Sequence, residues 1–164
     1  MRTELFQQIR AILVLPFTVT VVIPTFLWFT FTAPNEAWKS WLLLPALLLG
    51  GVGLWLLCWT ITLLVRVGKG TLAPWNPTRK LVVCGPYAHV RNPMLSGVFM
   101  ILLAEAIGAQ SGAIALWFLL FVLINAVYFV YSEEPGLRKR FGAEYEEYCR
   151  HVPRYLPRLT PWKP

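Results

Sequence analysis

The sequence contains no Asp, so its eight acidic residues are all Glu. Charged residues of both signs make up only 14% of the 164 residues, whereas soluble domains carry about 25%. Hydrophobic residues make up 57% of the chain. A soluble fold of this size cannot bury so much apolar surface. The composition therefore excludes an ordinary soluble domain and predicts that a lipid bilayer forms part of the solvent.

Cysteine is also scarce, and the three residues lack the spacing of metal ligands: Cys58, Cys84 and Cys149. Their odd number argues against a disulfide framework, and we expect no metal site. The net charge of +7 raises nucleic acid as a partner. However, the basic residues flank apolar runs and form no stripe with interleaved aromatics. We expect them to lie beside anionic lipid headgroups and to bind no nucleic acid.

Four apolar stretches approach the length of about 20 residues that a membrane helix needs: 9–31, 41–65, 94–109 and 113–131. Pro16 and Pro24 are predicted to kink the first span, which we expect to be retained as a membrane anchor. The short link Gln110–Ser111–Gly112 predicts a helical hairpin. The predicted fold is one all-α integral membrane domain over residues 1–164.

The placement of Lys and Arg predicts the orientation of these spans. With four spans, Lys39 stands alone on one side of the membrane. The other side holds the remaining 14 basic residues: Arg2, Arg10, Arg66, Lys69, Arg79, Lys80, Arg91, Arg138, Lys139, Arg140, Arg150, Arg154, Arg158 and Lys163. By the positive-inside rule, both termini, the loop 66–93 and the tail 132–164 are cytoplasmic. So compact a chain suits a bacterial-type inner membrane.

The tail carries an amphipathic pattern after its first acidic residues. Apolar and aromatic side chains recur at helical spacing: Leu137, Phe141, Tyr145 and Tyr148. This pattern predicts one cytoplasmic amphipathic helix that lies against the membrane or the bundle. Pro153, Pro157 and Pro161 then predict an extended end.

Two glycine-containing motifs lie in the predicted cytoplasmic loop. Gly68-Lys69-Gly70 follows the second span, and glycines there permit close approach of a ligand, although such a motif more often marks a turn. The segment 85–94 places Tyr87, His89, Arg91 and Asn92 at a membrane boundary. An interfacial anchor explains the Tyr and the Arg but not the dense Gly and Pro around them.

Three glutamates stand out beside or within the apolar spans. Glu133 and Glu134 end the fourth span, where carboxylates oppose the helix dipole, so either a ligand-binding role or a solvated start of the tail accounts for them. Glu105 lies inside the third span. An ionisable residue at membrane depth is either functional or a hydrogen-bonded structural group, and Asn125 is a candidate partner.

Together these residues resemble the isoprenylcysteine carboxyl methyltransferase family, which is itself similar to the phospholipid N-methyltransferases. The resemblance runs from about Gly68 to Pro157, slightly over half of the chain. Its order and spacing are specific, although each piece alone is not. It rests on Gly85-Pro86-Tyr87, Val90-Arg91-Asn92-Pro93, Glu133–Glu134, Leu137, Phe141-Gly142, Glu144-Tyr145, Tyr148, Val152-Pro153 and Leu156-Pro157.

The resemblance implies that S-adenosylmethionine is the cofactor. It implies a cofactor site built from Gly68, Gly70, Tyr87, His89, Val90, Arg91, Asn92, Pro93, Leu95, Glu133 and Glu134. Three positions depart from the family pattern. Asn92 stands where members often have His, Leu95 where they often have Tyr, and His151 where the isoprenylcysteine enzymes tend to have Arg.

The predicted activity is methyl transfer to a lipophilic acceptor at the cytoplasmic face, with membrane lipids as the surroundings. Arg91 and His151 are the candidate catalytic residues, Arg91 because its planar guanidinium suits a carboxylate. Glu105 and Tyr148 are candidates for acceptor binding. A prenylcysteine carboxylate and a phospholipid amine both remain open as acceptors, as does the oligomeric state. The alternatives are a nicotinamide-dependent membrane reductase and a non-enzymatic lipid-binding or assembly protein.

Overall fold

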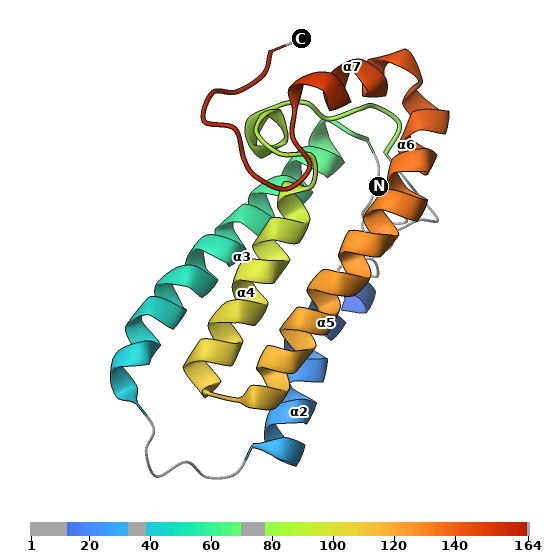
Figure 1. The fold of residues 1–164 in the computed structure, drawn as a ribbon. Helices are drawn as coiled ribbons and strands as arrows, with labels where there is room; N and C mark the ends of the chain where they lie inside the picture. The colour runs from blue at the N-terminus through green and yellow to red at the C-terminus, as the bar shows by residue number, and fades with distance from the viewer. Residues whose placement is uncertain (1–12, 33–38, 70–77, 164) are drawn as a thin grey trace.

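The computed structural model describes residues 13–32, 39–69 and 78–163, and these residues form helices and connecting segments without a strand (Figure 1). In chain order the elements are η1 (Leu13–Val22), α2 (Ile23–Phe31), η2 (Ser40–Leu42), α3 (Leu43–Arg66), η3 (Gly85–Ala88), α4 (Pro93–Ala109), α5 (Gly112–Tyr128), η4 (Phe129–Glu133), α6 (Glu134–Phe141) and α7 (Ala143–His151). The all-helical prediction is therefore confirmed.

The long helices α2, α3, α4 and α5 lie side by side and form a bundle (Figure 1). Two helical stretches are long and apolar enough to cross a membrane, Ser40–Arg66 and Gly112–Phe141. The other two apolar helices, Pro16–Phe31 and Pro93–Ala109, are shorter. The structure thus bears out two of the four predicted spans by length. Large apolar side chains such as Leu47, at 71% exposure, point outward from the bundle, as expected of lipid-facing helices.

The closest packing in the bundle joins α3 to α4 through glycines. A Cβ atom built on Gly53 would lie 2.8 Å from the carbonyl oxygen of Gly97. The converse Cβ on Gly97 would lie 2.9 Å from the carbonyl oxygen of Gly53. Because neither residue has a side chain, the two backbones approach each other more closely than larger residues allow.

The predicted hairpin between the third and fourth spans is present. α4 ends at Gln110, which adopts the left-handed conformation with a φ of 49°, and α5 begins at Gly112. The Gln110 side chain accepts a hydrogen bond from the backbone N–H of Lys39 and donates one to its carbonyl oxygen, each of 3.1 Å. Thr32 and Ser111 share a further hydrogen bond of 2.6 Å. These contacts fix the connections at this end of the bundle.

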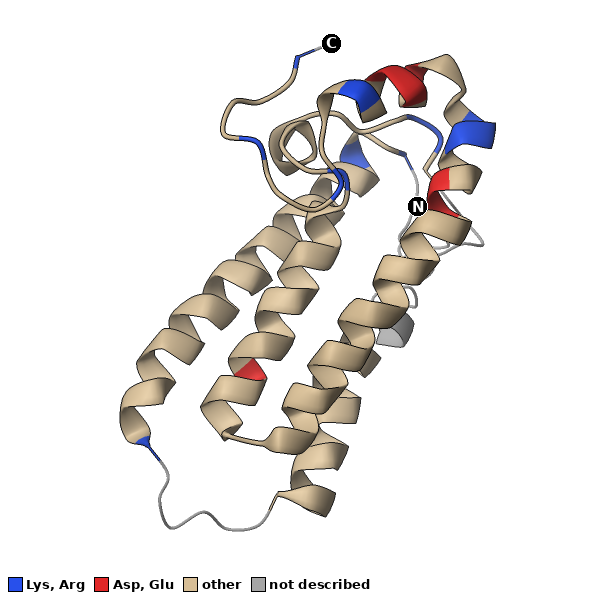
Figure 2. Ribbon diagram, viewed as in Figure 1, with Lys and Arg blue, Asp and Glu red and all other residues tan. Residues whose placement is uncertain are grey.

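The opposite end carries the polar structure. The loop 78–92, the helices α6 and α7 and the extended tail 152–163 gather there, together with most of the described charged residues (Figures 1 and 2). We call this the polar end. The helical path of α5 continues through η4 into α6, and its apolar part ends at about Tyr131, within η4.

The prediction of a single amphipathic helix in the tail is wrong in one respect. The helix is interrupted at Gly142, which has a φ of 54°, so two helices, α6 and α7, replace it. The predicted apolar side does hold together across the break. Tyr145, Tyr148 and Val152 form a buried cluster, and partly buried side chains pack against it: Leu81, Val83, Leu137, Phe141, Cys149 and Trp162.

Candidate functional site

A cavity of about 510 Å³ lies where the bundle meets the polar end. Apolar side chains from η1, α3 and α5 line one part of it, including Val19, Leu57 and Phe121. Its other part is lined by polar groups from the loop and from η4 and α7. Six of the predicted site residues lie on its wall: Tyr87, Arg91, Asn92, Leu95, Glu133 and Tyr148. The volume is in the range of small-molecule sites.

The segment before α4 is shaped by helix capping. The side-chain oxygen of Asn92 accepts a hydrogen bond of 3.3 Å from the backbone N–H of Leu95. Pro93 occupies the first helical position, where its missing N–H costs nothing. This local arrangement places Asn92 and Leu95 on the cavity wall, whereas Pro93 and Val90 are buried outside it.

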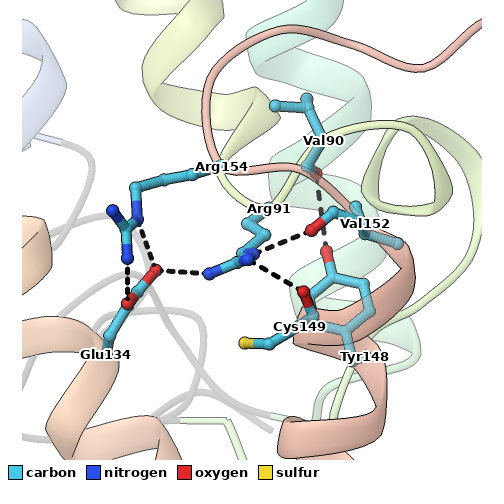
Figure 3. A network of polar contacts seen from close by, with 7 residues as sticks. All are labelled: Val90, Arg91, Glu134, Tyr148, Cys149, Val152 and Arg154. Carbon is cyan, nitrogen blue, oxygen red and sulfur yellow. Dashed lines mark hydrogen bonds and ion pairs between the residues drawn. The ribbon is translucent and has the colours of Figure 1, made fainter.

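The Arg91 side chain makes hydrogen bonds to three parts of the polar end, α6, α7 and the tail (Figure 3). Its Nε donates to the carbonyl oxygen of Val152 at 2.8 Å, and its Nη2 donates to that of Cys149 at 2.9 Å. Its Nη1 donates to Oε1 of Glu134 at 2.8 Å. The side chain is only 13% exposed. Each nitrogen of the guanidinium therefore has a protein partner, although the side chain also borders the cavity.

Glu134 is the carboxylate of a buried ion cluster with two arginines. Besides the bond from Arg91, it accepts two bonds of 2.8 Å from Nε and Nη2 of Arg154. Its side chain is 4% exposed. Burial raises the pKa of Glu134, but the hydrogen bonds and charges of Arg154 and Arg91 outweigh burial, so the pKa lies below its usual value. Glu134 is thus ionised and does not line the cavity.

Glu133 faces different surroundings, although it is adjacent in the chain. The π-helical turn η4 ends at Glu133, and α6 begins with Glu134. Single π-helical turns within α-helices are frequent at functional sites. Glu133 lies on the cavity wall and has no hydrogen bond or ion pair with any other described residue. Its carboxylate is therefore available to a ligand.

Two tyrosines of α7 reach the same cavity. The hydroxyl of Tyr148 donates to the carbonyl oxygen of Tyr87 at 2.8 Å, and burial raises its pKa, so it stays protonated. The hydroxyl of Tyr145 is buried and has no hydrogen-bond partner in the described part of the chain. Tyr145 lines the cavity, but its hydroxyl oxygen is enclosed by protein atoms near the Cys149 side chain and is not exposed to the cavity.

The two histidines lie away from the cavity and hold the tail. Nδ1 of His89 is 2.7 Å from the carbonyl oxygen of Arg158, whose backbone N–H in turn donates to the carbonyl oxygen of His89. His151 stacks on Trp162, with ring centres 5.2 Å apart and an interplanar angle of 7°. His151 does not border the cavity, so its predicted catalytic role gains no geometric support.

Gly68 and Glu105 are also outside the cavity, and Gly70 lies outside the described residues. The carbonyl oxygen of Gly68 accepts hydrogen bonds from the N–H groups of Arg79 and Lys80, which join the end of α3 to the loop. One carboxylate oxygen of Glu105 is buried without a described partner. Among the described residues, no hydrogen bond joins Glu105 to its candidate partner Asn125, whose amide donates to the carbonyl oxygen of Phe121.

Sequence reasoning missed two residues of the site. Arg154 completes the ion cluster. Its position in the sequence, directly after Val152-Pro153, does not indicate that it pairs with Glu134, because opposite charge alone does not identify a partner. Tyr145 was predicted as part of the apolar side of the tail helix. The helical spacing correctly predicts that Tyr145 is buried, but spacing alone does not predict that its ring lines the cavity.

Comparison with known proteins identifies the family of this chain. A family described as phospholipid methyltransferase matches residues 41–144. The chain belongs to the phospholipid methyltransferase family. The match includes α3, the loop, α4, α5, α6 and Glu133, and it confirms the relationship predicted from the sequence motifs. No curated protein and no solved structure matches the chain. Membership and the two long apolar helices together indicate a membrane-associated methyltransferase.

Proposed function

We propose that this protein transfers a methyl group from S-adenosylmethionine to a lipophilic acceptor at the cytoplasmic face of a membrane. The observation that carries the proposal is a single cavity with a polar wall at Glu133 and Asn92 and an apolar wall at Val19 and Phe121. The polar wall suits a zwitterionic cofactor, and the apolar wall suits an acceptor that arrives from the bilayer. The methyltransferase family supplies the class of reaction.

The proposed topology has four spans, with the shorter helices Pro16–Phe31 and Pro93–Ala109 completing the two long ones. A short helix is accommodated when the bilayer thins locally or when polar flanking groups reach the interface. Most described charges lie at the polar end, which we assign to the cytoplasm (Figure 2). Both termini are then cytoplasmic, as the distribution of Lys and Arg predicts.

The residues of the cavity fit the proposed cofactor. The carboxyl group of Glu133 suits its ammonium group or its ribose hydroxyls. Asn92 and Leu95 border the same space. When bound, the cofactor supplies a methyl group already activated by the positive sulfonium. The protein then has to align the donor with the acceptor and exclude water.

The family match favours a phospholipid amine over a prenylcysteine carboxylate as the acceptor, because the matching family is the phospholipid one. His151 in place of Arg agrees with this choice. A reductase has no support from the comparisons. A lipid-binding protein without activity is the remaining alternative, and lipid labelling distinguishes it from an enzyme.

Calorimetry with the purified protein tests the cofactor assignment. We expect S-adenosylhomocysteine to bind and NADPH not to bind. Glu133→Gln should weaken S-adenosylhomocysteine binding roughly tenfold, since a hydrogen bond to a charged group contributes about 1.5–3 kcal/mol. Its unfolding temperature should stay that of the wild type. Glu147→Gln is the control, because Glu147 lies on the exposed side of α7. Wild-type affinity in Glu133→Gln would remove Glu133 from the site.

The acceptor is tested separately by mass spectrometry of lipids incubated with protein and isotopically labelled cofactor. We expect the label in the amine headgroup of a phospholipid. Cofactor binding without labelled lipid would support the lipid-binding alternative.

A further inference from the structure

A second cavity, of about 340 Å³, lies at the polar end and shares Arg91 with the first one. Its walls come from the loop, α6, α7 and the tail. Six residues line it: Arg91, Arg138, Glu146, Cys149, Arg150 and Arg154. Four of the six are arginines, and Arg91 is the one residue among them that also borders the first cavity. The methyl-transfer proposal makes no use of this second space.

The arginines differ in exposure from the base of this cavity to its mouth. Arg91 and Arg154, which hold Glu134 between them, are 13% and 33% exposed and form the base (Figure 3). Arg150 is 72% exposed at the mouth, where it makes an ion pair of 3.3 Å with Glu147. The base is therefore fixed by buried bonds, while the mouth is free to adjust to a ligand.

The charges at this cavity do not balance. Glu134 is the anionic partner at the base, and Glu146 and Glu147 are the carboxylates near the mouth. Even when all three are counted against the four guanidinium groups, one positive charge is unmatched. Arg138 carries the clearest unmatched charge, because its side chain has no hydrogen bond or ion pair among the described residues.

We infer that this cavity binds a phosphate group. Guanidinium groups present several N–H donors in a fixed plane and recognise phosphate and carboxylate oxygens in pairs. Arginines from the loop, two helices and the tail border one cavity, and donors from several elements suit the tetrahedral oxygens of a phosphate better than a planar carboxylate. The phosphate comes either from a phospholipid headgroup or from free phosphate in the cytoplasm. The site is independent of the proposed methyl transfer, because its assignment uses no feature of the cofactor site except the shared Arg91.

Titration of the full-length protein with inorganic phosphate tests the site, at constant ionic strength so that screening does not change. We expect wild-type protein to bind phosphate and Arg138→Gln to weaken binding about tenfold, with a further loss in Arg138→Gln combined with Arg150→Gln. Lys139→Gln is the matched control: it removes the same charge from the same helix but does not line the cavity. It should bind phosphate as the wild type does.

A second titration, with a soluble short-chain phosphatidylglycerol, identifies the source of the phosphate. Tighter binding of this lipid than of inorganic phosphate, lost in the double variant, assigns the site to a headgroup, and the reverse order assigns it to free phosphate. The proposal is overturned if the wild type binds neither ligand, or if the double variant binds both as the wild type does. Because S-adenosylhomocysteine is absent from both titrations, such a failure leaves the proposed function untouched.

Discussion

Glu133 and Glu134 are neighbours in the chain, but they have different surroundings. Glu133 borders the cavity without a partner among the described residues, whereas Glu134 is buried between Arg91 and Arg154. We therefore expect the two carboxyl groups to contribute to different properties, Glu133 to the proposed ligand binding and Glu134 to the stability of the polar end.

Replacing Glu134 with Gln should destabilise the protein even without a ligand. The change leaves two buried or half-buried arginines without their anion, and breaking such a cluster costs about 3 kcal/mol. Thermal unfolding in detergent measures this loss. Glu147→Gln should change the unfolding temperature little, because its ion pair with Arg150 is exposed. Equal effects of the two substitutions would contradict the structural role of Glu134.

The stability should also depend on pH through Glu134. Its pKa is below the usual value in the folded state, so its stabilising contribution is complete above a pH of about 4.5 and is lost as the pH falls below that value. The unfolding temperature of the wild type should fall over this acidic interval. In Glu134→Gln the fall should be shallower, and a slope as steep as that of the wild type would argue against this linkage.

At the scale of the helices, small residues decide how closely α3 and α4 pack. Gly53→Ala should destabilise the bundle by about 1–3 kcal/mol, because its Cβ would lie 2.8 Å from a carbonyl oxygen of α4 that cannot move freely. Gly51→Ala is a matched control on the same helix, since a Cβ there meets nothing within 4 Å. Thermal unfolding of both variants in the same detergent tests this contact. We expect a lower unfolding temperature for Gly53→Ala alone.

The helices also show where sequence periodicity gives the wrong boundaries. The apolar spacing from Leu137 to Tyr148 correctly predicts which residues pack together, because that spacing reflects one buried side. It does not predict the break at Gly142, since a glycine inside a helical pattern is compatible with both a continuous helix and a helix end. The π-helical turn η4 is equally invisible in the hydrophobic pattern.

For the molecule as a whole, the orientation in the membrane is open to test. Green fluorescent protein fused to the C-terminus should fluoresce, and alkaline phosphatase fused there should be inactive, because the proposed topology places the basic polar end in the cytoplasm. Alkaline phosphatase fused after Lys39 should be active. An active phosphatase at the C-terminus would contradict the four-span topology.

The sequence by itself determined the class of this protein. Its apolar stretches, the asymmetry of its basic residues and its motifs are local properties, and they predict helices, a membrane and a methyltransferase-like cavity wall around Tyr87, Arg91 and Asn92. Only the tertiary structure decided which glutamate faces the cavity, that Arg154 joins the ion cluster, and that His151 stacks on Trp162. Those outcomes depend on the turn of η4 and on the return of the tail across the loop. Both depend on contacts between residues far apart in the chain, which local patterns do not record.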